Sequence, residues 1–297
     1  MSGSTRFTVI TDYLGVSGLE RYQDETRYCR YLVLGIDPGL GIGGHATGIE
    51  GVSLRDGTQL LEFRSNSTSP RSVVEKVLTS IFLDPSFETV LVVIESNTIG
   101  KDLISRYLEL PEFWESKKIS LKLPPLYQSF KKDRQPIYGF ESSAANKQML
   151  IAEVRELIKQ DPEVIKSHRL VNELLGFQIL PGGKLGAKHG SARTDDLVIA
   201  YALALKGRQY YFLHSPDPAV LRALDFPAAT ASASEASLLP YLGRIHYSAS
   251  EEPLRVFDLE RARLKEEIWK AIRAGQNPLE LRKALEDLKP EERSIAE

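Results

Sequence analysis

The sequence predicts an α/β fold built on a mixed sheet, in which three antiparallel strands come first and parallel strands follow. Two observations carry this prediction. Short runs of apolar and β-branched residues recur in the first third of the chain, and two of them are separated by an Asp-Gly turn. Later runs are separated by segments with apolar residues at helical spacing, a pattern typical of parallel strands joined by crossover helices.

The antiparallel part of the sheet is predicted from three segments. Residues 31–36, with the sequence YLVLGI, form the first apolar run, and 45–54 and 59–64 form the second and third. Asp56 and Gly57 lie between the last two runs, and Asp-Gly is a strong hairpin signal because it accepts the positive φ angles of a tight turn. We therefore expect an antiparallel meander.

The parallel part begins with residues 89–94, TVLVVI, a run without polar positions after its first residue. Such a run is typical of a strand buried on both faces by helices. The other elements predicted after the meander are helices at 73–81, 100–108, 143–159, 164–175 and 194–205, a strand at 119–123, a loop at 124–142 and a hairpin beginning at 177. These helices are expected to flank the sheet.

The 297 residues are expected to divide into three regions. Residues 1–29 are polar and predict a lead-in or linker, and 30–215 hold the α/β domain. Residues 216–297 predict a loop followed by a charged helical extension, with amphipathic helices at 259–272 and 278–288.

Composition excludes several classes of protein. The formal net charge is −2, so any nucleic-acid contact requires a local concentration of basic residues. Cys29 is the single cysteine, which excludes an internal disulfide or a thiolate metal site and fits a reducing, cytoplasmic compartment. No stretch approaches the roughly 18 apolar residues of a membrane span, and residues 1–12 do not resemble a signal peptide.

Four acidic residues lie where apolar segments begin or end. Asp37 follows the first strand, Glu95 follows TVLVVI, and Asp195 and Asp196 open the helix at 194–205. Each acid alone has an ordinary explanation, in a loop, as a helix N-cap or at the positive end of a helix dipole. Together they indicate a functional site, because carboxylates beside so much apolar sequence are costly unless a cation pairs with them.

A divalent cation such as Mg²⁺ or Mn²⁺ is the expected partner, because hard cations prefer oxygen ligands. Two such ions about 3.5–4 Å apart can hold the attacking and leaving oxygens of a phosphodiester displacement. Asp37 is the expected bridging ligand, and Glu95, Asp195 and Asp196 are expected to complete the two coordination shells. The pattern therefore predicts a two-metal-ion nuclease.

Glycine motifs do not support a nucleotide-binding protein. Gly39, Gly41 and Gly44 match GxGxxG, but a strand pattern follows them where a dinucleotide-binding site requires a helix. The glycines instead predict a tight turn and a close approach of nucleic-acid backbone or metal. The chain has no GxxxxGK[ST] motif, which excludes a P-loop ATPase within it.

Basic residues interleaved with aromatic ones predict contacts with DNA phosphates. The expected DNA-binding residues are Lys131, Lys132, Lys147, Lys184, Lys188 and Arg193. For residues 117–134, a solvated loop is slightly favoured over a DNA contact. Lys147 is explained equally well as a lysine on the surface of a helix. For His189 the sequence leaves three roles: a catalytic proton shuttle, an extra metal ligand or a surface histidine.

The motifs LVLGIDPG, VVIESNTIG, ANKQMLIAEVRELI, LGFQILPGGKLGAKHG and GSARTDDLVIAYALAL occur in that order. In order and spacing, over about residues 30–207, the chain resembles the nuclease domain of the phage terminase large subunit, in the RNase H-like superfamily. The resemblance implies an RNase H-like fold and an endonuclease that cuts double-stranded DNA, such as viral genome concatemers during packaging. It assigns Asp37, Glu95, Asp195 and Asp196 as the acidic set.

The same resemblance implies work in the host-cell cytoplasm and three partners: an ATPase motor domain, a portal protein and a small terminase subunit. The alternative is a RuvC-type Holliday junction resolvase, because GIDPGLG is close to the opening motif of that family. An actin-like kinase would need a second glycine-rich hairpin, which the sequence lacks. A binding module without catalysis would not be expected to keep all four acids.

Overall fold

The computed structural model describes residues 7–24, 27–40, 46–130, 136–179, 185–187, 194–214 and 217–224. All of them belong to the unit Met1–Gly243. The helices predicted at 259–272 and 278–288 lie outside the described residues. Among the helices that are described, none is both long enough and apolar enough to cross a bilayer.

A six-stranded mixed sheet forms the centre of the fold, with the strand order β1-β2-β5-β4-β3-β6. Its strands are β1 (Thr8–Ile10), β2 (Leu19–Gln23), β3 (Tyr31–Asp37), β4 (Thr47–Ser53), β5 (Gln59–Ser65) and β6 (Glu88–Ile94). Neighbouring strands are antiparallel except β3 and β6, which are parallel. This arrangement confirms the predicted mixed sheet, in which three antiparallel strands are followed by a parallel one.

The sheet continues beyond β5 into the segment that the sequence predicted as a lead-in. β2 pairs with β5 and β1 pairs with β2, so residues 8–10 form the edge strand and residues 19–23 the strand next to it. Leu19 and Tyr22 of β2 are buried while their neighbours are half-buried or exposed. These strands are short and carry polar residues, which is common at a sheet edge.

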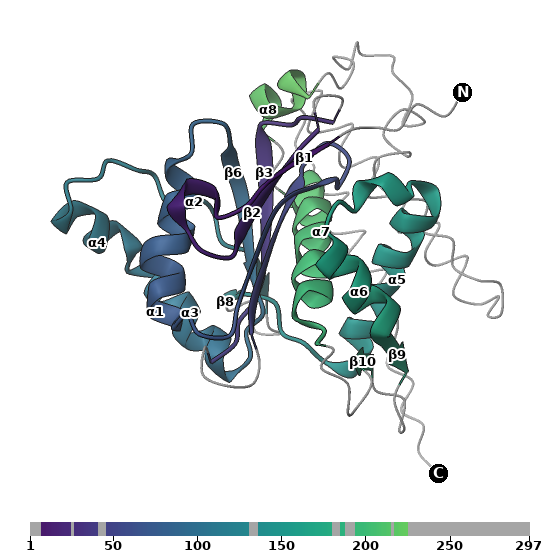
Figure 1. The fold of residues 1–297 in the computed structure, drawn as a ribbon. Coiled ribbons are helices and arrows are strands. Elements are labelled where there is room, and N and C mark those ends of the chain that lie inside the picture. Colours follow the sequence, from purple (N-terminus) through teal and green to yellow (C-terminus); the bar gives the residue numbers. More distant parts are fainter. Residues whose placement is uncertain are drawn as a thin grey trace, which may run out of the picture. The chain divides into compact units, whose positions relative to one another are not determined.

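Helices cover both faces of the sheet (Figure 1). One face carries α1 (Pro70–Ser72), η2 (Val73–Leu78), α2 (Thr79–Leu83), α3 (Thr98–Leu108) and α4 (Leu110–Ser116). The other carries α5 (Ala144–Gln160), α6 (His168–Gly176) and α7 (Asp196–His214). Short elements complete the described chain: η1 (Tyr13–Gly15), η3 (Pro162–Val164), α8 (Pro218–Ala223) and the hairpins β7 (Gln128–Phe130) with β8 (Pro136–Tyr138) and β9 (Phe177–Ile179) with β10 (Leu185–Ala187).

The helical segment after β5 follows the predicted apolar pattern. Ser69 caps it, because its side chain accepts a hydrogen bond from the Ser72 amide at 3.3 Å. The apolar residues predicted to share one face are all buried. The central turns, Val73–Leu78, are wider than α-helical turns and have π-type geometry.

The strand predicted at 119–123 is not formed. The outer edge of β6 is instead paired with residues 125–127: the Val92 amide donates to the Pro125 carbonyl at 2.9 Å, and the Tyr127 amide donates to the Val92 carbonyl at 2.8 Å. Isolated parallel bridges join Val92 to Leu126 and Glu95 to Phe140. The predicted loop 124–142 therefore contains the β7–β8 hairpin and supplies the contacts that a further parallel strand would make.

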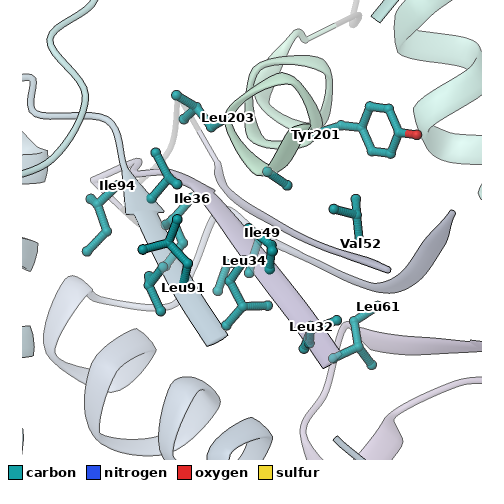
Figure 2. Packing of buried hydrophobic residues seen from close by; sticks show 14 of the residues in the cluster. Leu32, Leu34, Ile36, Ile49, Val52, Leu61, Leu91, Ile94, Tyr201 and Leu203 are labelled. Carbon is teal, nitrogen blue, oxygen red and sulfur yellow. The ribbon is translucent and has the colours of Figure 1, made fainter. Parts of the chain in front are cut away.

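The long helix α7 packs directly on the sheet because two strands carry glycine at the contact. A Cβ built on Gly35 would lie 2.1 Å from the Ala200 carbonyl oxygen, and one on Gly48 would lie 2.7 Å from that of Asp196. Figure 2 shows Val52 on the side of Tyr201, which belongs to α7, and Leu32 with Leu61 beneath the opposite face. Glycine at these positions lets the helix backbone approach the strands closely.

The turn between β4 and β5 forms where the Asp-Gly signal predicted it. Gly57 has a φ of 79°, which favours glycine, and its carbonyl accepts a hydrogen bond from the buried Tyr201 hydroxyl at 2.9 Å. The Arg208 guanidinium donates to the Leu54 and Arg55 carbonyls, each at 2.8 Å. The turn is thus held by two side chains of α7.

Candidate active site

Three of the four predicted acids meet at one end of the sheet. Asp37 ends β3, Glu95 follows β6, and Asp196 is the first residue of α7. β3 and β6 are parallel, with Ile36 opposite Ile94, so the next residue of each strand reaches the same edge. Gly48 lies opposite Asp37 in the β3–β4 register and against the Asp196 backbone. The topology therefore brings together three carboxyl groups that are far apart in the sequence.

The carboxyl groups of Asp37 and Glu95 are hydrogen-bonded to each other. Burial, followed by the negative charges of Glu95 and Asp196, raises the pKa of Asp37 well above its usual range. Burial also acts to raise the pKa of Glu95, but the hydrogen bond from Asp37 and the charge of Lys147 outweigh it, so that pKa is lowered. The two shifts are opposite in direction, so they favour the protonated form of Asp37 and the charged form of Glu95.

Glu95 is buried and is held by polar groups on either side. The Asn97 amide nitrogen donates to Glu95 Oε2 at 2.8 Å, while Asn97 Oδ1 caps α3 by accepting from the Gly100 amide at 2.8 Å. Lys147 Nζ of α5 lies 3.3 Å from Glu95 Oε1. Lys147, predicted as a DNA contact, therefore lies within the acidic group.

Asp196 is buried and has a cationic neighbour on β5. Arg64 Nη2 lies 3.4 Å from Asp196 Oδ2 and donates to Thr194 Oγ1 at 3.0 Å. Arg64 is the residue of β5 opposite Gly48, so its side chain lies on the same face of the sheet as Asp37. This cation offsets part of the negative charge of the group.

The N-terminus of α7 is capped by a residue from another helix. Glu173 of α6 accepts hydrogen bonds from the amides of Leu197 at 2.8 Å and Val198 at 3.4 Å, both through Oε2. Its Oε1 accepts from the Thr194 hydroxyl at 2.6 Å and lies 3.4 Å from Arg64 Nε. A helix N-cap is one ordinary explanation of Asp195 from the sequence, and the structure assigns the contacts of the Leu197 and Val198 amides to Glu173.

Asp195 is half-buried just before α7, and its carbonyl accepts a hydrogen bond from the Ile199 amide at 3.0 Å. Among the described residues, its side chain makes no contact with the other three acids, so its place in the metal site stays a prediction. Its proximity in sequence to Asp196 is the observation that supports it.

The oxygen donors of Asp37, Glu95 and Asp196 suit a hard divalent cation in their chemistry. Within the described part of the chain, however, no group of three or more Asp, Glu, His or Cys side chains is arranged to hold a metal ion as it stands. In the structure as it stands, Asp37 is hydrogen-bonded to Glu95, and the Lys147 ammonium lies 3.3 Å from Glu95 Oε1.

Several predicted site residues lie outside the described residues. They are His189 and the basic residues Lys131, Lys132, Lys184, Lys188 and Arg193. Their roles remain predictions.

Sequence reasoning missed three residues of the site: Arg64, Asn97 and Glu173. Asn97 and Arg64 could have been suspected from the sequence, because both lie at the same ends of strands as the acids. Glu173 is harder to identify, because the sequence shows only an acid within an amphipathic helix. Whether such an acid caps another helix depends on how the helices pack.

No protein-family model matches the chain, and no curated protein matches it. Solved structures of terminase nucleases are similar to it. The large terminase nuclease from thermophilic phage G20c with bound magnesium has a TM-score of 0.41 and 15% identity, over 64% of this chain and 87% of that one. The human cytomegalovirus terminase nuclease domain has a TM-score of 0.41 and 14% identity, over 60% and 83%. The large terminase nuclease domain of Thermus phage P74-26 has a TM-score of 0.36 and 15% identity, over 59% and 77%.

Proposed function

We propose that this chain is a metal-dependent endonuclease that hydrolyses phosphodiester bonds of double-stranded DNA. The observation that carries the proposal is the convergence of Asp37, Glu95 and Asp196 at the end of β3, the end of β6 and the start of α7. Three carboxyl groups gathered in a largely buried site repel one another, and a cation is the partner that relieves this repulsion.

The three carboxyl groups have distinct tasks in this proposal. Asp37 is close to both of the others, since the charges of Glu95 and Asp196 both raise its pKa, and it is the proposed bridging ligand of two ions. Glu95, oriented by the Asn97 amide, is proposed to complete one shell. Asp196, beside Arg64, is proposed to complete the other with Asp195.

Mg²⁺ or Mn²⁺ ions bound there would lower the pKa of an attacking water and stabilise charge on the leaving 3′ oxygen. The protein itself supplies a rigid arrangement, because two of the acids are attached to paired strands. Lys147 Nζ, 3.3 Å from Glu95, can turn toward a bound phosphate once a cation takes its place beside that carboxylate.

A more specific proposal concerns the DNA-binding residues, the substrate and the partner proteins. The basic residues at 131–132, 184, 188 and 193, with Lys147, are proposed to contact DNA phosphates, and His189 is proposed to aid proton transfer. Residues 30–215 are the proposed nuclease domain. By the sequence resemblance, the substrate is viral genome concatemers during packaging, and the partners are an ATPase motor, a portal protein and a small terminase subunit.

Nicking of supercoiled plasmid tests the proposal directly. The full chain is incubated with plasmid in Mg²⁺, in Mn²⁺ or in a chelator, and parallel reactions contain linear duplex or a synthetic four-way junction. We expect metal-dependent nicking and duplex cleavage. Asp37→Asn should lower the rate by at least about a thousandfold, because the variant loses a carboxylate needed for charge balance with the ions.

Asp102→Asn is the matched control, because Asp102 is an exposed acid of α3 that forms only a surface ion pair with Arg106. This variant should cut like the wild type. Cleavage in chelator, or an unchanged rate in folded Asp37→Asn, would contradict the proposal. Cleavage confined to the four-way junction would favour the resolvase alternative.

A further inference from the structure

Glu173 of α6 contacts several polar groups at the start of α7. Its two carboxylate oxygens accept three hydrogen bonds, from the Thr194 hydroxyl and the Leu197 and Val198 amides. Arg64 approaches the same carboxylate at 3.4 Å and also contacts Asp196 and Thr194. Glu173 is buried, so water does not readily replace these bonds.

The three converging acids are not fixed in the same way. Asp37 is within β3, and the amide of Glu95 donates to the Ile36 carbonyl at 3.0 Å, so both belong to the hydrogen-bonded sheet. Asp196 instead occupies the first position of a helix, where the backbone amides have no partner within the helix. The position of Asp196 therefore depends on the residues that cap α7 and hold its first turn against Gly48.

We infer that Glu173 is a positioning residue, which holds the first turn of α7 so that Asp196 can share a cation with Asp37. The inference rests on the proposed nuclease function for its purpose, but not for its structural content. Glu173 contributes the cap from α6, and Arg64 and Thr194 tie that carboxylate to Asp196. A negative charge at this place also interacts favourably with the positive end of the helix dipole.

The packing of α6 explains how Glu173 reaches this place. The Gln59 side-chain carbonyl accepts hydrogen bonds from the amides of Lys166 at 2.9 Å and Ser167 at 2.8 Å. Ser167 then caps α6 by accepting from Arg169 and Leu170. The segment before α6 is thereby tied to β5, and Glu173 is placed about two turns further along the helix.

Hydrogen exchange of the Leu197 and Val198 amides tests the cap without any metal or DNA. Three variants are compared with the wild type: Glu173→Ala, Glu173→Gln and the exposed neighbour Asn172→Ala as control. Glu173→Ala should speed exchange of these two amides by roughly tenfold or more, since a buried charged acceptor is lost. Glu173→Gln keeps an acceptor oxygen and should restore most of the protection.

Mn²⁺ titration by calorimetry and steady-state plasmid nicking then test the positioning role. In Glu173→Ala, the Mn²⁺ affinity should fall about 10–100-fold, as is usual when a group that orients a ligand is removed. The value of kcat should fall with it while KM for DNA stays within about twofold, because Glu173 does not reach the substrate. Glu173→Gln should recover both, and Asn172→Ala should match the wild type.

Thr194→Val keeps the inference testable if Glu173→Ala does not fold. It removes the hydroxyl that donates to Glu173 and should weaken Mn²⁺ binding in the same direction, by less. Unchanged exchange at Leu197 and Val198, or wild-type Mn²⁺ affinity in folded Glu173→Ala, would overturn the inference. A wild-type protein that binds no Mn²⁺ and cuts no DNA would refute the proposed function instead, while the exchange result would still decide whether Glu173 holds α7.

Discussion

Glu50 of β4 and Glu62 of β5 lie directly opposite each other in the sheet, and both are wholly buried. The Gln59 amide nitrogen donates to both carboxyl groups, at 2.8 Å to Glu50 and 3.3 Å to Glu62. Burial, followed by the charge of Glu62, raises the pKa of Glu50 well above its usual range. Like charges placed opposite each other destabilise a sheet, so the facing Glu62 favours the protonated form of Glu50.

Replacing Glu50 with Gln should therefore stabilise the protein, and more so at higher pH. A carboxyl whose folded pKa is raised gives up stability as pH rises from its unfolded value of 4.5 through the folded value. Gln does not ionise, so Glu50→Gln should raise Tm relative to the wild type at pH 8 and change it little at pH 4. Thermal unfolding at both values measures this.

Glu112→Gln, at an exposed position of α4, is the control and should leave the pH dependence unchanged. A Tm difference for Glu50→Gln that is equal at both pH values would show that burial and the like charge of the facing Glu62 do not govern the pKa of Glu50.

Gly48→Ala should weaken metal binding through the backbone of Asp196. The added Cβ would lie 2.7 Å from the Asp196 carbonyl oxygen, so the start of α7 must shift away from β4. Overpacking of this kind costs about 1–3 kcal/mol of unfolding free energy. We expect that loss in urea unfolding, together with a clear drop in Mn²⁺ affinity by calorimetry.

Gly51→Ala separates the loss of stability from the loss of Mn²⁺ affinity, because Gly51 belongs to the same strand but faces away from α7. Its Cβ would meet Leu32 Cδ1 and Leu61 Cβ, both at 3.0 Å. This variant should lose stability yet bind Mn²⁺ like the wild type. An equal loss of affinity in both variants would argue against a specific link between Gly48 and Asp196.

Lys147→Met should tighten the binding of Mn²⁺. The ammonium of Lys147 lies 3.3 Å from Glu95 Oε1, where it competes with a divalent ion for the carboxylate. Its removal leaves Glu95 with less compensating charge, which also favours a cation. Calorimetry should show a higher Mn²⁺ affinity, even if nicking becomes slower through loss of a phosphate contact.

Lys206→Met provides the comparison, since Lys206 of α7 lies 3.7 Å from Glu153 of α5, a similar half-buried pair. Mn²⁺ binding should be unaffected in this variant. If Lys147→Met binds Mn²⁺ more weakly than the wild type, the lysine assists the cation and does not compete with it.

Lys166→Met should be strongly destabilising. Lys166 Nζ lies 2.8 Å from Asp24 Oδ2, and both side chains are almost completely buried. Removing one partner of a buried ion pair leaves an uncompensated charge and costs about 3–5 kcal/mol. Urea unfolding should show this loss, and the double variant Asp24→Asn with Lys166→Met should recover much of it. Equal stability of the single and double variants would show that the loss comes from packing.

The central sheet could be predicted because its strands are distinct apolar runs. The β4–β5 turn and the ends of β3 and β6 were predicted closely, and with them the meeting of Asp37 and Glu95, because residues that follow parallel strands share an edge. Strands β1 and β2 were missed, since three and five residues of mixed polarity carry little periodic signal. The predicted strand at 119–123 failed because residues 125–127 bind the edge of β6.

Long-range polar contacts explain the remaining differences. The helix predicted at 164–175 is divided into η3 and α6, because the amides of Lys166 and Ser167 bond to Gln59 of a distant strand. The Glu173 cap of α7 likewise depends on a neighbour that is remote in sequence. Local propensity cannot anticipate such partners, because the helix itself supplies only unsatisfied amides.

The late position of α7 in the chain has a consequence for synthesis in the cell. Proteins emerge from the ribosome N-terminus first, so a nascent chain presents all six strands, with Asp37 and Glu95, before Asp196 has been translated. Under the proposed function, such an intermediate would be harmless to DNA. Cleavage competence would begin only when α7 leaves the exit tunnel and docks on the glycines of β3 and β4, which delays the nuclease until the domain is nearly complete.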